Sequence, residues 1–81
     1  ANGFPPLQPD MDPAHWTKIM SRDFEDFQSH HKSGLDRYGA TNPAEFFAVL
    51  SEVFFETPQK LIEAYPDIYD IMVKFFRQTP L

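Results

Sequence analysis

The residues best suited to chemistry in this 81-residue sequence form a short run from Asn42 to Glu45, Asn-Pro-Ala-Glu. Locally this run is a capping box, in which Asn42 accepts a hydrogen bond from the first helical turn and Glu45 reaches back to another free N–H group. Glu45 also stands where the helix dipole favours an ionised carboxylate. Zinc accepts an ionised and oriented carboxylate as a ligand. The run therefore supports two interpretations, a helix cap and a metal ligand.

The helix that begins at this run carries further carboxylates. A period of 3.6 residues places Glu45, Val49, Glu52 and Glu56 along one side, while most other positions are apolar. A helix that is apolar nearly all round is expected to be buried on most sides, with its carboxylates partly enclosed. Glu45 and Glu52 stand about 10 Å apart along the axis, but helical faces supply that spacing by chance.

The histidines do not complete a metal site. His30 and His31 are adjacent, so on a helix they point about 100° apart, and His15 stands alone. The sequence has no HExxH motif and no histidine pair four residues apart, and it contains no cysteine. Phosphate-binding glycine loops and nucleophile elbows are also absent from the sequence. The 81 residues alone do not supply the three protein ligands of a catalytic zinc site.

Four prolines indicate where helices begin, because proline is tolerated at the first helical position. They predict helices over residues 13 to about 30–32, 43 to 55 or 56, 58 to about 65, and 66 to a point before Pro80. Residues 33–42 read as a loop, and no segment shows the alternation of a strand. The predicted fold class is all-α, a compact bundle of about four helices over residues 12–81, with an extended Pro-rich lead-in over residues 1–11.

Composition limits the possible partners. The net charge is −5 and the pI is about 4.9, with no basic stripe to neutralise nucleic-acid phosphates or anionic lipid. No apolar run approaches the ~20 residues that cross a bilayer, and no signal peptide is recognisable. We therefore expect no nucleic acid, no membrane and a cytoplasmic location. Nine Phe, three Tyr and one Trp predict a strongly aromatic core.

The run from Leu35 to Phe55, LDRYGATNPAEFFAVLSEVFF, closely resembles the C-terminal part of the Mlc titration factor A family. The similarity extends to the lead-in Asn2–Leu7 and to the terminal helices. This family consists of cytoplasmic bacterial zinc-dependent peptidases whose metal site is related to that of anthrax lethal factor. The resemblance implies that Glu45 is a zinc ligand and that Tyr38, seven residues earlier, assists the transition state. It assigns Asp36 and Glu52 structural roles, or a role in orienting a ligand histidine.

The same resemblance implies that an HExxH helix, with two histidine ligands and the general base, lies upstream of this chain in a longer protein. Zinc and a peptide substrate would belong to that protein, and the 81 residues alone are expected to bind zinc weakly and to be inactive. Two alternatives remain. One is a helical interaction module that binds a repressor such as Mlc, and the other is a structural domain in which Glu45 is only a cap. Exposed apolar surface could also favour an oligomer.

Overall fold

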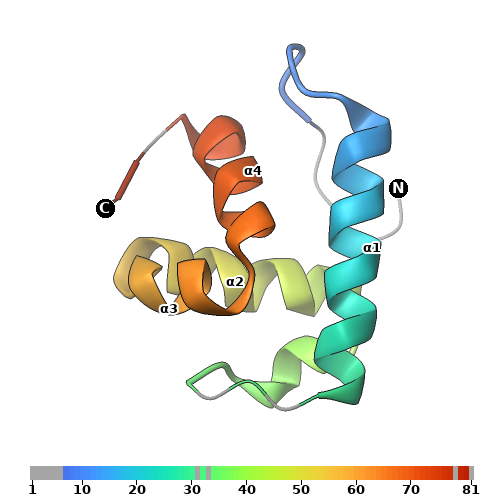
Figure 1. Cartoon of the computed structure of the whole chain (residues 1–81), viewed down its shortest axis with the longest axis vertical. Helices are drawn as coiled ribbons and strands as arrows, with labels where there is room; N and C mark the ends of the chain where they lie inside the picture. The colour runs from blue at the N-terminus through green and yellow to red at the C-terminus, as the bar shows by residue number, and fades with distance from the viewer. Residues whose placement is uncertain (1–6, 31, 33, 78, 81) are drawn as a thin grey trace.

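The computed structural model describes residues 7–30, 32, 34–77 and 79–80, and the regular structure within them is helical (Figure 1). The elements are, in chain order, α1 (Pro13–Ser29), the 3-10 turn η1 (Arg37–Ala40), α2 (Pro43–Glu56), α3 (Pro58–Ala64) and α4 (Pro66–Phe76). The prediction of an all-α fold with about four helices is confirmed. None of the helices in the described part of the chain is both long and apolar enough to cross a membrane.

Each helix begins at one of the four prolines, because the residue before a proline is held away from helical backbone angles. Asp12 and Asn42 have extended backbones, and their side chains accept hydrogen bonds at 2.9 Å from the N–H groups of Ala14 and Glu45. Thr57 and Tyr65 each end one helix and precede the next. The helices α2, α3 and α4 are therefore joined through single residues.

The lead-in is held against the last helix. Of its predicted extent, residues 1–6 lie outside the described residues, and within the remainder the Met11 N–H donates to the Gln8 carbonyl at 3.0 Å. The Gln8 amide donates to the carbonyl of Phe75, and Asp10 forms an ion pair with Arg77. These contacts connect the region before α1 to the end of α4.

The core draws large side chains from all four helices. The fully buried side chains include Phe27 of α1, Phe46 and Phe54 of α2, Leu61 of α3, and Ile68 and Met72 of α4. The ring centroids of Phe27 and Phe46 lie 5.5 Å apart. Tyr65 meets both of these rings edge-on. The elements on which a site could be built are therefore fixed by an aromatic centre.

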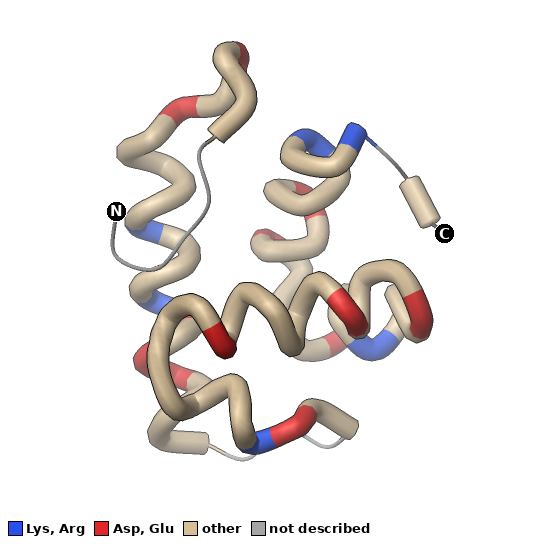
Figure 2. Tube along the Cα trace, turned by 180° about the vertical axis from the view of Figure 1, so that it is seen from behind, with Lys and Arg blue, Asp and Glu red and all other residues tan. Residues whose placement is uncertain are grey.

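The molecule is flat, with principal extents of 33 × 28 × 15 Å. An α-helix with its side chains is about 10–12 Å across, so a body this thin does not cover a helix on opposite sides. Figure 2, seen from behind, shows α2 crossing the near face with no other element in front of it. One face of α2 is exposed, formed by Ala44, Ala48, Glu52, Phe55 and Glu56, and its other positions are buried or half-buried. The expectation that its carboxylates are partly enclosed is therefore wrong for Glu52 and Glu56, whereas Glu45 is half-buried.

Candidate functional site

The predicted loop before α2 contains the short turn η1, and Asp36 fixes its start. An Asp36 carboxylate oxygen accepts a hydrogen bond from the Tyr38 N–H at 2.9 Å, and the Asp36 carbonyl accepts from the Gly39 N–H at 3.1 Å. The Thr41 N–H donates to the Tyr38 carbonyl at 3.1 Å. Asp36 thus has a local structural role, which is to hold the backbone that carries Tyr38.

The turn lies directly on α1 and α2 because residue 39 is a glycine. Gly39 is buried, and a Cβ atom added there would stand 3.2 Å from a ring carbon of Phe27 and 3.2 Å from the Cβ of Val49. Both distances are shorter than most side-chain contacts in proteins. The absence of a side chain at Gly39 therefore allows η1 to approach the first turns of α2 this closely.

This approach brings Tyr38 and Glu45 together. Tyr38 is 59% exposed, and Glu45 is half-buried in the first turn of α2. The Glu45 carboxylate raises the pKa of Tyr38 above its usual value, first as a hydrogen-bond acceptor and then through its negative charge. A tyrosine is protonated at neutral pH, and this shift favours the protonated, donating form further. The Glu45 N–H donates to the Asn42 side chain at 2.9 Å, which fixes the backbone of Glu45 in the first turn of α2.

Glu52 is not part of this pair. It lies seven residues beyond Glu45 on the exposed face of α2, which at 1.5 Å per residue is about 10 Å along the helix axis. Glu56, one turn further on, is also exposed. Of the four residues selected from the sequence, the structure therefore brings Asp36, Tyr38 and Glu45 together and leaves Glu52 separate.

Sequence reasoning missed Arg37, which joins η1 to the end of α1. Its guanidinium donates to the carbonyl oxygens of Phe27, His30 and Gln28 and lies 4.7 Å from the centroid of the Phe27 ring. The available signal was that α1 has no basic residue in its own last turn. A cation from elsewhere in the chain could have been expected there, since the C-terminal end of a helix is electronegative.

The donor atoms at this junction suit one position of a zinc site. Glu45 is a half-exposed carboxylate with a protonated phenol beside it, which fits a single oxygen ligand and not a complete site. No group of three or more His, Cys, Asp or Glu side chains that could hold a metal occurs among the residues that the structure describes. His15 and His30 lie away from this junction, and the Nδ1 atom of His30 stands 3.2 Å from a carboxylate oxygen of Asp26. His31 is outside the described residues.

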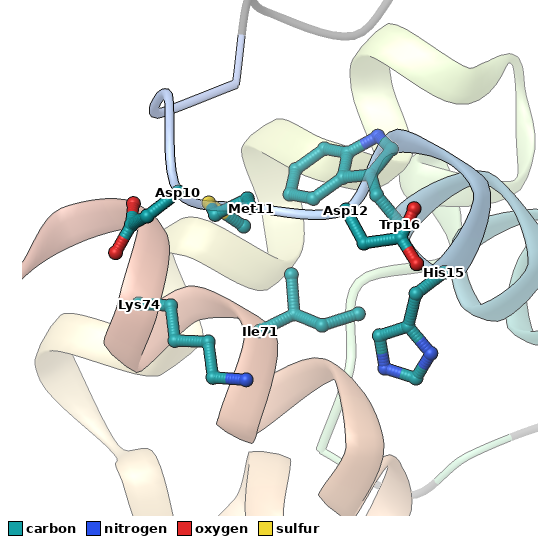
Figure 3. Close-up of a pocket in the computed structure, with 7 residues that line it drawn as sticks. All are labelled: Asp10, Met11, Asp12, His15, Trp16, Ile71 and Lys74. Carbon is teal, nitrogen blue, oxygen red and sulfur yellow. The ribbon is translucent and has the colours of Figure 1, made fainter.

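A cavity of about 320 Å³ lies away from this junction, between the start of α1 and α4 (Figure 3). Figure 3 shows the His15 ring and the Lys74 amine on either side of Ile71. The two carboxylates that line the cavity already have partners. Asp10 forms an ion pair with Arg77, and Asp12 accepts a hydrogen bond from the Ala14 N–H. The cavity contains none of the residues selected from the sequence, and it is lined by Asp10, Met11, Asp12, His15, Trp16, Ile71 and Lys74.

Comparisons with known proteins give a consistent result. A family model described as glucose-regulated metallo-peptidase M90 matches residues 1–77. The chain is 38% identical to the Mlc titration factor A of Edwardsiella ictaluri and to that of Serratia proteamaculans, in each case over all of this chain and 33% of the relative. It is 37% identical to an uncharacterized protein of Synechocystis, over 99% of this chain and 30% of that protein. The chain thus spans about a third of the length of these relatives. No solved structure matches it.

Proposed function

The chain belongs to the glucose-regulated metallo-peptidase M90 family, and on that premise we propose that it is part of a zinc-dependent peptidase of the cytoplasm. Its contribution to that enzyme is one zinc ligand, Glu45, and one hydrogen-bond donor to the transition state, Tyr38. This proposal is supported best by the close packing of η1 on α2 at Gly39, which places the Tyr38 phenol beside the Glu45 carboxylate.

Zinc, when bound, would polarise a peptide carbonyl and activate water. Glu45 would bind the metal through its carboxylate, held in place by the first turn of α2 and the Asn42 cap. Tyr38 would donate its single O–H group to the oxygen that becomes negative during hydrolysis, after releasing the Glu45 carboxylate to which it donates in this structure. Its exposure leaves the hydroxyl accessible to a peptide.

The described residues include no group of three or more side chains that could hold a metal, and we infer that the remaining ligands come from elsewhere in the longer protein. We propose that an HExxH helix in the longer protein supplies two histidines and the general base. Glu52 would then contact one of those histidines, because the outer face of α2 is open to a neighbouring element. Hydrogen bonds of this kind orient ligand histidines, and their loss typically costs 10- to 100-fold in metal affinity or activity. Asp36 would act indirectly by holding the backbone of Tyr38.

Substitution of Glu45 by Gln in the longer protein tests the ligand role. The expected result is a loss of bound zinc and of peptide hydrolysis, because an amide is a poor replacement for an anionic ligand. Glu56→Gln is the matched control, since it makes the same change at an exposed position of the same helix. Zinc content should be measured by atomic emission after dialysis. Equal zinc content in the Glu45→Gln variant and the parent would refute the ligand role.

Substitution of Tyr38 by Phe tests the donor role separately. The zinc content should be retained while kcat falls on the order of 10²- to 10³-fold, the usual effect of removing one oxyanion donor. An unchanged kcat would show that the phenol does not act in the reaction.

A second candidate is a helical interaction module, with an Mlc-like repressor as its partner. Two observations favour it: the name of two of the relatives, Mlc titration factor A, and the exposure of Tyr38 (59%) and Phe55 (44%). Large exposed aromatic side chains are frequent anchors of protein interfaces. Calorimetry of the chain with purified repressor should detect binding that Phe55→Ala weakens. Absence of heat at high concentration would eliminate this candidate.

A further inference from the structure

The C-terminal end of α1 requires partners from outside the helix. The last carbonyl groups of any α-helix have no N–H donors of their own, and the helix dipole concentrates negative potential there. At the end of α1, the C-cap residue His30 has an extended backbone, and the last turn contains no basic residue. The end of α1 is therefore a site that attracts a cation with several donors.

Arg37 meets this requirement. Its guanidinium donates to three carbonyl groups at the end of α1, those of Phe27, Gln28 and His30, with the latter two bonds at 3.3 and 3.2 Å. The same group lies over the Phe27 ring at 4.7 Å. A planar guanidinium can make such a set of bonds because its five N–H donors have fixed directions. The Gln28 amide adds a bond to the Ala40 carbonyl at 3.2 Å.

Arg37 and Tyr38 are consecutive residues of a 3-10 turn, which has about three residues per turn, so their side chains leave the backbone about 120° apart. One reaches the end of α1 and the other reaches Glu45 at the start of α2. Because η1 has only four residues, a movement of Arg37 is transmitted to Tyr38. The turn thus connects two helix ends that are adjacent in space.

We propose that Arg37 is a positioning residue of the site: it fixes η1 to the C-terminal carbonyl groups of α1 and thereby holds the Tyr38 phenol beside Glu45. This inference rests on the proposed function where it concerns the reaction. Arg37 itself does not touch the metal or the peptide, and its effect passes through Tyr38.

A double-mutant cycle in the longer zinc-bound protein tests this. Arg37→Ala should lower kcat on the order of tenfold to a hundredfold, as displaced catalytic groups do, with little change in KM. In a Tyr38→Phe background the same substitution should lower kcat by about twofold or less, because Arg37 acts through the Tyr38 hydroxyl; two independent effects would instead add. Arg37→Lys retains a positive charge at the helix end and should recover part of the lost kcat. Equal losses in both backgrounds would overturn the proposal, since they would indicate a general effect on folding.

A measurement on the 81-residue chain separates this inference from the proposed function. Proton NMR should detect cross-peaks between the Tyr38 ring and the Glu45 side chain, and Arg37→Ala should abolish them. Arg77→Ala is the matched control, because it removes an exposed arginine–carboxylate pair that does not involve η1. Circular dichroism verifies that both variants are helical. Retained cross-peaks in Arg37→Ala would refute the positioning role even if the peptidase is active, and lost cross-peaks would support it even if no peptidase activity is found.

Discussion

Substitution of Gly39 by Ala perturbs the contact on which the candidate site depends. The new methyl group would stand 3.2 Å from both a ring carbon of Phe27 and the Cβ of Val49. Neither neighbour can move away easily. The Cβ of Val49 is attached to the backbone of α2, and the fully buried Phe27 ring contacts both Phe46 and the guanidinium of Arg37.

The expected cost follows from these contacts. An added methyl group in a tightly packed position typically destabilises a protein by about 1–3 kcal/mol. With rigid atoms on two sides, we expect a value of about 2 kcal/mol, unless η1 lifts away from α2 to relieve it. For a domain of this size each kcal/mol lowers Tm by about 4–8 °C, so the midpoint should fall by about 8–16 °C.

Thermal unfolding followed by circular dichroism gives the midpoint, and the NMR cross-peaks between Tyr38 and Glu45 report the position of η1. Gly34→Ala is the control. Its φ of +82° makes an alanine there unfavourable by about 1–2 kcal/mol, but its Cβ would meet only the flexible end of Lys60. Gly34→Ala should therefore lower Tm and keep the Tyr38–Glu45 contact. A Tm of Gly39→Ala equal to that of the parent, together with retained Tyr38–Glu45 cross-peaks, would show that the contact at Gly39 is not tightly packed.

Three further predictions concern stability and titration. Tyr65→Phe keeps the ring contacts but removes the O–H bond to Asp26 at 2.8 Å, and should cost about 1 kcal/mol at neutral pH in urea unfolding, because water still reaches this carboxylate. That bond is the main reason why the pKa of Asp26 lies below its ordinary value. The stability that the bond contributes is therefore present above about pH 4 and is lost as the pH falls through the lower folded pKa. A stability difference between Tyr65→Phe and the parent that persists unchanged at about pH 2 would contradict this. Glu45→Gln should lower the pKa of Tyr38 toward that of an ordinary tyrosine in an NMR titration, whereas Glu56→Gln should leave it raised. Asn42→Ala removes the cap of α2 and should destabilise the protein by about 1 kcal/mol, and an unchanged midpoint would show that the cap is redundant.

The helix starts were predictable because they depend on local chemistry. A residue before proline is extended in almost any context, so Asp12-Pro13 and Asn42-Pro43 indicate the same boundaries in the sequence and in the structure. The end of α1 was less accurate: the helix stops at Ser29, whereas the pattern extended it to residue 30 or 32. Helix ends without a glycine or proline depend on distant partners, and here that partner is Arg37.

The candidate site was predictable only in part, for a related reason. The cap at Asn42 follows from local rules, and the importance of Tyr38 and Glu45 came from the family resemblance. Their contact depends on the position of η1, which is set by the fit of Gly39 against Val49 and by Arg37 on α1. These are tertiary contacts between segments that have no common sequence pattern. The exposure of Glu52 likewise depends on the flatness of the whole molecule, which periodicity along one helix does not contain.

The single-residue joints at Thr57 and Tyr65 have a consequence for how this part would meet the rest of a longer protein. With no spare residue between α2, α3 and α4, the helices cannot change their mutual angles unless the backbone at one joint changes. At Tyr65 such a change would also break the phenol bond to Asp26 of α1. The chain should therefore associate with the rest of a longer protein as a preformed rigid body, with little conformational entropy lost on binding. Insertion of one glycine at either joint should consequently weaken association more than an insertion of the same length between α1 and η1.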